Sequence, residues 1–278
     1  MTKLFSALIL CAVLSSCASR PEAPVLRPLT AQAQAVTTTR LDALLPMDVL
    51  LLGEQHDAAE HQLIHQQVIA LLAQRGLLAA LALEMADAGV TTARQHPSST
   101  EQEVKNALKW NDKSWPWAAY GPAVMTAVRA GVLVVGANLP RELMRPKMAD
   151  ITLDGQLPGP ALKAQQQLIR TGHCNLLPES QITPMTRIQM ARDISMAETL
   201  KDVALPGKVV VLLAGSAHAD RLLGVPQHLP ASLKVKAVRL RAGDAAAVDK
   251  ADAFDAVWAT PALPEKDYCA AFKAQMGK

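Results

Sequence analysis

The sequence predicts an α/β fold in which a mainly parallel sheet is flanked by helices and carries a smaller helical lobe. Short apolar runs alternate with amphipathic stretches, as strands and helices do in α/β proteins. The runs are continuously apolar, which is typical of strands that are covered on both faces. Half of the 278 residues are hydrophobic and 19% are charged, so we expect a sizeable core and no global disorder.

Six apolar runs are the predicted strands. The second is rich in Ala and Leu, which suit a helix equally well. The long segment between the third and fourth runs lacks strand signals, and we expect it to form the inserted lobe over about residues 140–205. The six runs cover residues 48–52, 78–85, 132–136, 208–214, 233–240 and 253–258.

Two amphipathic stretches predict well-defined helices. The first covers residues 57–74, where Asp57 and Glu60 fit an N-terminal capping box. The second begins at Thr183, which is expected to cap it, and runs to about Val203. On this helix we expect Asp193 to form a structural ion pair with its neighbour Arg192.

The N-terminus has the features of a lipoprotein export signal. Lys3 precedes an apolar stretch that is too short to span a membrane, and the stretch ends in Leu-Ser-Ser-Cys at Cys17. This pattern predicts a signal peptide over residues 1–16 and lipidation of Cys17. Ordinary cleavage near Ser16 or Ala18 is the alternative.

A lipidated Cys17 would hold the protein on a bacterial membrane, facing the periplasm. Ala18 rather than Asp follows the cysteine, as in lipoproteins of the outer membrane. Residues 17–39 include three prolines and are expected to be a tether, and residues 40–278 are expected to form the α/β domain. The formal net charge is only +3, without a basic run, so no nucleic-acid partner is predicted.

The cysteines support export to an oxidising compartment. With Cys17 lipidated and residues 1–16 removed, Cys174 and Cys269 remain. A disulfide between them is the economical interpretation, and two buried thiols are the alternative.

Four of the predicted strands deliver polar residues at their carboxyl ends, which meet at one edge of a parallel sheet. This pattern suits a metal site with nitrogen and oxygen ligands, or acid–base pairs with shifted pKa values. Capping and structural roles at the strand ends are the alternative. The residues are Glu54, His56, Glu84, Asn138 and His218.

Two further histidines lie on the first predicted helix. His61 is one turn into it, beneath the strand ends, and is a candidate site residue, whereas His65 is expected to be solvated. The sequence has no CxxC motif, phosphate-binding loop or GxSxG elbow, so it gives no sign of a zinc ribbon, a nucleotide-binding loop or a serine hydrolase.

Taken in order, the motifs of this chain resemble the ChaN family of haem-binding lipoproteins. That family belongs to the Tiki superfamily, together with TraB-like proteins and erythromycin esterases. The resemblance runs from about Leu41 to Cys269. The motifs are LLGEQHD, LALEM, WxxY, VGANLPR, GHC, QMARDISMA, LLAGSAH, LGVPQHL and DYC.

The resemblance implies a haem carrier for iron uptake, with the α/β fold of this superfamily. In a described case a pair of haems lies between two subunits with tyrosine as the iron ligand, which implies a homodimer formed on haem binding. Tyr120, which follows a cluster of tryptophans, is the candidate ligand, and Tyr268 beside Cys269 is expected to be structural. Further candidates for the haem site are His61, Asn138, Arg141 and Lys147.

The superfamily also implies an alternative function. Its GxxH and Glu motifs are linked to hydrolysis, which can be metal-dependent. In this version Glu54, His56, Glu84 and His218 hold a divalent metal or polarise water directly, with Glu84 as general base. A non-catalytic scaffold whose polar residues only stabilise the fold is the third possibility.

Overall fold

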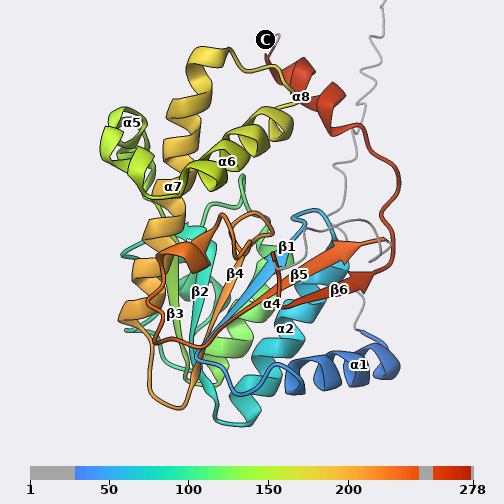
Figure 1. Ribbon diagram of the computed structural model, residues 1–278. Coiled ribbons are helices and arrows are strands. Elements are labelled where there is room, and N and C mark those ends of the chain that lie inside the picture. Colours follow the sequence, from blue (N-terminus) through green and yellow to red (C-terminus); the bar gives the residue numbers. More distant parts are fainter. Residues whose placement is uncertain (1–28, 244–252, 277–278) are drawn as a thin grey trace, which may run out of the picture.

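Six parallel strands form the central sheet in the computed structural model of the chain, which describes residues 29–243 and 253–276 (Figure 1). The strand order is β3-β2-β4-β1-β5-β6. All six strands run parallel, so the predicted fold class is confirmed. The strands are β1 (Val49–Glu54), β2 (Leu78–Asp87), β3 (Leu133–Asn138), β4 (Val209–Gly215), β5 (Val235–Ala242) and β6 (Ala256–Thr260).

Helices cover both faces of the sheet, which explains the continuously apolar strands. In β1, Leu50 and Leu52 join a core with the helices of one face, whereas Val49 and Leu51 point into a second core on the opposite face. The helices are α1 (Ala31–Asp42), α2 (Ala59–Gln74), α3 (Glu101–Ala107), α4 (Trp117–Arg129), α5 (Arg141–Ala149), α6 (Gly159–Gly172), α7 (Glu179–Asp202) and α8 (Tyr268–Met276), with short 3-10 turns at Ile151–Gly155 and Val225–His228.

The predicted helical lobe is present above the carboxyl ends of the strands (Figure 1). It consists of α5, α6 and the first half of α7, and it has a small core of its own around Leu153, Leu157 and Met190. The second half of α7 continues down onto the sheet, where Met196 and Leu200 are buried. Helix α7 therefore ties the lobe rigidly to the sheet.

Two predicted helix starts are wrong. The N-cap of α2 is Ala58, which supplies no side-chain hydrogen bond. Asp57 binds Gln55 and Tyr268 instead of capping the helix. Helix α7 begins at Glu179, so Thr183 lies inside it.

The N-terminal segment also differs from its prediction where the structure describes it. Residues 31–39, expected to be part of a tether, belong to α1, which Thr30 caps through its side chain. The three prolines of the predicted tether all precede residue 29, so nothing breaks a helix after it. The predicted signal peptide and Cys17 lie outside the described residues, among which no helix is long and apolar enough to cross a membrane.

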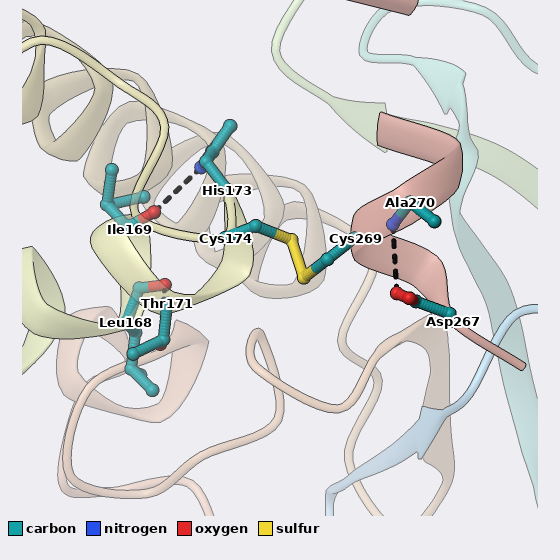
Figure 2. Close-up of a disulfide and its surroundings, with 8 residues drawn as sticks. All are labelled: Leu168, Ile169, Thr171, His173, Cys174, Asp267, Cys269 and Ala270. Carbon is teal, nitrogen blue, oxygen red and sulfur yellow. Dashed lines mark hydrogen bonds between the residues drawn. A yellow bond between two sulfur atoms is a disulfide. The ribbon is translucent and has the colours of Figure 1, made fainter. Parts of the chain in front are cut away.

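The predicted disulfide between Cys174 and Cys269 is present, with the two Cα atoms 5.6 Å apart (Figure 2). It joins the end of α6 to α8, which the extended segment after β6 carries up beside the lobe (Figure 1). The bond therefore closes a covalent ring of residues 174–269, which includes α7 and strands β4, β5 and β6.

Candidate functional site

The strand order brings the two motifs GEQH and GSAH together. Strand β4 lies between β1 and β2, and Glu54 at the end of β1 is in register with Gly215 at the end of β4. A cavity of about 780 Å³ opens at these strand ends. Its lining residues are Glu54 to Asp57, Glu84, Gln189, Arg192, Gly215 to His218, Arg239 to Arg241, Lys266 and Tyr268.

Glu54 is buried and fully hydrogen-bonded. Tyr120 donates to its Oε1 at 2.5 Å and Gln62 donates to its Oε2 at 2.7 Å. The ring Nδ1 of His56 lies 2.7 Å from Oε1. Burial would raise the pKa of Glu54, but His56 and the other partners outweigh it and hold that pKa below its usual value.

His56 connects the buried Glu54 carboxylate to the cavity. Its side chain is 43% exposed, whereas that of Glu54 is fully buried. Burial lowers the pKa of His56, but Glu54 and Glu84 outweigh this effect and raise it. A Cβ on Gly215 would lie 3.0 Å from the His56 Nε2, so glycine at this position leaves room for the ring.

A second buried network lies beside the first. The backbone N–H of Gly215 donates to Glu84 Oε2 at 2.7 Å, and His218 Nε2 lies 3.4 Å from Glu84 Oε1. The other ring nitrogen of His218 lies 2.5 Å from Asp193, so Asp193 binds this histidine instead of Arg192. The sequence does not reveal this pairing, because it depends on how α7 packs over the carboxyl ends of the strands in the folded protein.

The pKa values of this network reflect one buried cation between two carboxyl groups. Burial opposes the charge of His218, but Glu84 and Asp193 raise its pKa to about 10. Burial would raise the pKa of Glu84, but mainly His218 lowers it to about 2. Burial raises the pKa of Asp193 to about 6 against the attraction of His218. Each group thus depends on its neighbours for its charge.

A second cavity of about 580 Å³ adjoins the first and shares Glu84 and Arg192 with it. Asn138 and Arg141 line this second cavity, and Asn138 Nδ2 donates to the backbone oxygen of Glu84. Lys147 on α5 lines neither cavity and pairs with Asp150, just after that helix, at 2.8 Å. The structure therefore places Glu54, His56, Glu84 and His218 around the first cavity and Asn138 beside Glu84 in the adjoining one. Lys147 is separate from both cavities.

Tyr120 and His61 are buried beneath the cavity. Tyr120 is 2% exposed, and burial together with Glu54 raises its pKa well above the usual range, so the phenol keeps its proton. His61 is fully buried, accepts a hydrogen bond from the backbone N–H of Gln55 and contacts Thr260. Burial lowers the pKa of His61 to about 4, which leaves it neutral. Neither side chain can reach a ligand in the cavity without rearrangement.

His65 was expected to face solvent, but it is buried, with its Nδ1 3.6 Å from Glu54 Oε2. The predicted helix is present as α2, but its face that carries His65 packs against Glu54 of β1. Its burial reflects helix packing, which the local sequence does not reveal.

Tyr268 is the exposed phenol of the cavity. It is 48% exposed, donates a hydrogen bond to Asp57 at 2.8 Å and accepts one from Gln55 at 3.2 Å. The Lys266 ammonium lies 4.9 Å from the centre of its ring and 3.4 Å from Asp57. The sequence offered the Asp-Tyr-Cys motif as a signal, but its link to the disulfide suggested a purely structural role.

The predicted metal set is not arranged as a metal site. Among the residues that the structure describes, no group of three or more His, Cys, Asp and Glu side chains could hold a metal ion. The reason is local: Glu54 is occupied by Tyr120 and Gln62, and Glu84 by a backbone amide. These carboxylates act as hydrogen-bond acceptors within the protein.

Two solved structures are similar to this chain. A solved structure of ChaN from Campylobacter jejuni, described as binding haem cofacially, is 28% identical, with a TM-score of 0.64 over 78% of this chain and 89% of that chain. The type III effector HopBA1 is 17% identical, with a TM-score of 0.47 over 86% of this chain and 99% of that one. A comparison with curated proteins gives no match.

The match to a family model covers most of the α/β domain. Residues 40–229 match the model described as haem-binding uptake, Tiki superfamily, ChaN. The matched range contains β1 to β4 and the lobe, and therefore both polar networks at the strand ends. The chain belongs to the ChaN family of the Tiki superfamily.

Proposed function

We propose that this protein binds haem at the cavity above β1 and β4, with Tyr268 as the iron ligand, and that it serves haem or iron uptake. The observation that carries the assignment is the contrast between the two tyrosines. Tyr268 is half-exposed at the cavity, whereas Tyr120 is buried and its hydroxyl is held by Glu54. Tyr268 thus replaces Tyr120 as the candidate ligand.

The residues around Tyr268 fit a haem group. Ferric iron accepts a phenolate ligand, and the two propionates require cations or hydrogen-bond donors. Asp57 and Gln55 orient the phenol, and Lys266 places an ammonium beside it. Arg192 lines the same cavity and reaches the adjoining one.

The proposal includes the setting of the protein. Lipidation at Cys17 would place the domain at the bacterial cell envelope, facing the periplasm, most simply at the outer membrane. A half-exposed ligand leaves one side of the haem open, which a second copy of the chain could cover to form a homodimer. The cofacial haem of the ChaN from Campylobacter jejuni supports this arrangement.

The test is a haemin titration of the mature chain and of two matched variants, Tyr268→Phe and Tyr120→Phe. Tyr268→Phe should abolish the high-spin ferric tyrosinate spectrum, and Tyr120→Phe should retain it. Sedimentation with and without haemin measures the dimer, and membrane fractionation of Cys17→Ser tests the anchor. A spectrum that survives in Tyr268→Phe would contradict the assigned ligand.

A second candidate function is hydrolysis without a metal. The observation that favours it is the Glu54–His56 pair, in which the carboxylate orients an imidazole that reaches the cavity. In this role His56 Nε2 takes a proton from water. Turnover of p-nitrophenyl acetate or p-nitrophenyl phosphate that is lost in His56→Ala, and unaffected by chelators, would support it. Equal rates in the variant and the parent would exclude it for these substrates.

A further inference from the structure

We propose that the disulfide between Cys174 and Cys269 positions Tyr268 for haem, and that its reduction by a dithiol releases the haem. The inference rests on the proposed function of Tyr268 as iron ligand. It assigns to the disulfide a role in ligand binding beyond the stability that a covalent ring provides.

The position of Tyr268 depends on few elements. It is the first residue of α8 and the immediate neighbour of Cys269. Residues 261–267, which connect β6 to α8, form neither helix nor strand. The disulfide is therefore the covalent link that fixes α8 to the lobe (Figure 2), and Cys269 directly follows Tyr268 in the sequence.

Among the side chains of α8 that the structure describes, Tyr268 and Phe272 make noncovalent contacts with the rest of the protein. Tyr268 hydrogen-bonds Asp57 and Gln55, and the ring of Phe272 lies edge-on 5.7 Å from that of His173. The Tyr268 hydrogen bonds are also the contacts that iron ligation would alter, because the hydroxyl proton is lost when the phenolate forms. The bond at Cys269 is independent of that change.

The other end of the bond is fixed by the C-terminal turn of α6. Cys174 and the following Asn175 both have φ of 57°, in the left-handed region that residues other than glycine rarely adopt. His173, at the end of α6, hydrogen-bonds the carbonyl of Ile169 (Figure 2). Backbone hydrogen bonds from Cys174 to Thr171 and from Asn175 to Arg170 hold this turn at the end of α6, so reduction frees α8 while Cys174 stays in place.

The reaction requires an external reductant of the dithiol class. A thiolate of the dithiol attacks one sulfur, the Cys174–Cys269 bond breaks, and a mixed disulfide forms. The second thiol then closes the dithiol into its own disulfide. Two electrons and two protons pass to the protein, which gains two thiols. Both cysteines are partly exposed, so a small dithiol can reach them.

The experiment compares haemin binding by the oxidised mature protein, by the Cys174→Ser/Cys269→Ser double variant and by Tyr268→Phe. The double variant removes both thiols, so a cysteine cannot replace tyrosine on the iron. Its circular dichroism without haemin establishes that it is folded. Dithiothreitol treatment of the parent protein, followed by reoxidation, provides a second test that needs no substitution.

If α8 holds Tyr268 in place for less than a tenth of the time without the disulfide, the apparent Kd for haemin rises about tenfold. We expect at least this rise in the double variant and in the reduced parent, with loss of the tyrosinate spectrum and recovery on reoxidation. An unchanged Kd and spectrum in both would overturn the inference while leaving Tyr268 as the ligand. If the oxidised parent fails to bind haemin, or Tyr268→Phe binds it unchanged, the proposed function fails first.

Discussion

The substitution Tyr120→Phe tests whether Tyr120 is a structural residue or an iron ligand. The change removes the hydroxyl that donates to Glu54 at 2.5 Å, within a fully buried carboxylate environment. The ring itself remains, and it keeps its contacts with Trp115 and Trp110 at centroid distances of 5.8 and 6.2 Å. The cost is therefore that of a hydrogen bond to a charged group, without a cavity.

Such a bond contributes about 1.5–3 kcal/mol. For a domain of this size, each kcal/mol lowers Tm by about 2–4 °C, so the Tm of Tyr120→Phe should fall by about 3–12 °C. Thermal unfolding followed by circular dichroism measures this shift. Tyr268→Phe is the matched control, because its phenol is half-exposed and its loss should change Tm far less.

The haemin spectrum of the same two proteins completes the comparison. Tyr120→Phe should lose stability and keep the tyrosinate spectrum, whereas Tyr268→Phe should show the reverse. The reasoning would be refuted if Tyr120→Phe unfolded at the parental Tm and lost the spectrum. That result would mean that the buried phenol becomes accessible when haem binds.

Three other perturbations test the networks around the cavity. Because the fold raises the pKa of His218 from 6.5 to about 10, its contribution to stability is complete below pH 6.5 and is lost as the pH rises through 10. The urea midpoint should fall over this range, and less so in His218→Gln. Gly215→Ala should displace the His56 ring at a cost of about 1–3 kcal/mol, visible as a shifted His56 resonance and a lower urea midpoint. Loss of the disulfide in Cys174→Ser/Cys269→Ser should cost up to about 4–5 kcal/mol in urea unfolding, since the bond spans 95 residues.

The parts of the fold that could be predicted from sequence are those fixed by local patterning. Continuous apolar runs identified all six strands, and the polar residues at the ends of four of them identified the edge where the cavity lies. Glu54 and Gly215 lie 161 positions apart, yet the parallel sheet alone predicts that their strand ends share one edge.

What could not be predicted depends on packing between remote elements. The sequence shows that Tyr120 lies near tryptophans, but not that α4 turns its hydroxyl inward onto Glu54. The position of Tyr268 is fixed by the neighbouring disulfide and by a hydrogen bond to Asp57, which is 211 positions away in the sequence. Exposure distinguishes these two phenols, and exposure is a property of the tertiary structure.

The buried networks around Glu54 and Glu84 differ from the exposed residues of the cavity in how readily their polar groups can bind a ligand. Glu54 and Glu84 receive their hydrogen bonds from Tyr120, Gln62 and a backbone amide, so they are already satisfied within the protein. A ligand that competed for them would leave these donors unpaired, at a cost of about 1–3 kcal/mol for each buried group. Tyr268 is half-exposed at the cavity. An iron that bound its oxygen would therefore replace only hydrogen bonds that are already exposed to solvent. The family motifs at the strand ends therefore form the buried base of the cavity, and under the proposed function haem would bind to the exposed side chains above it, with Tyr268 on the iron.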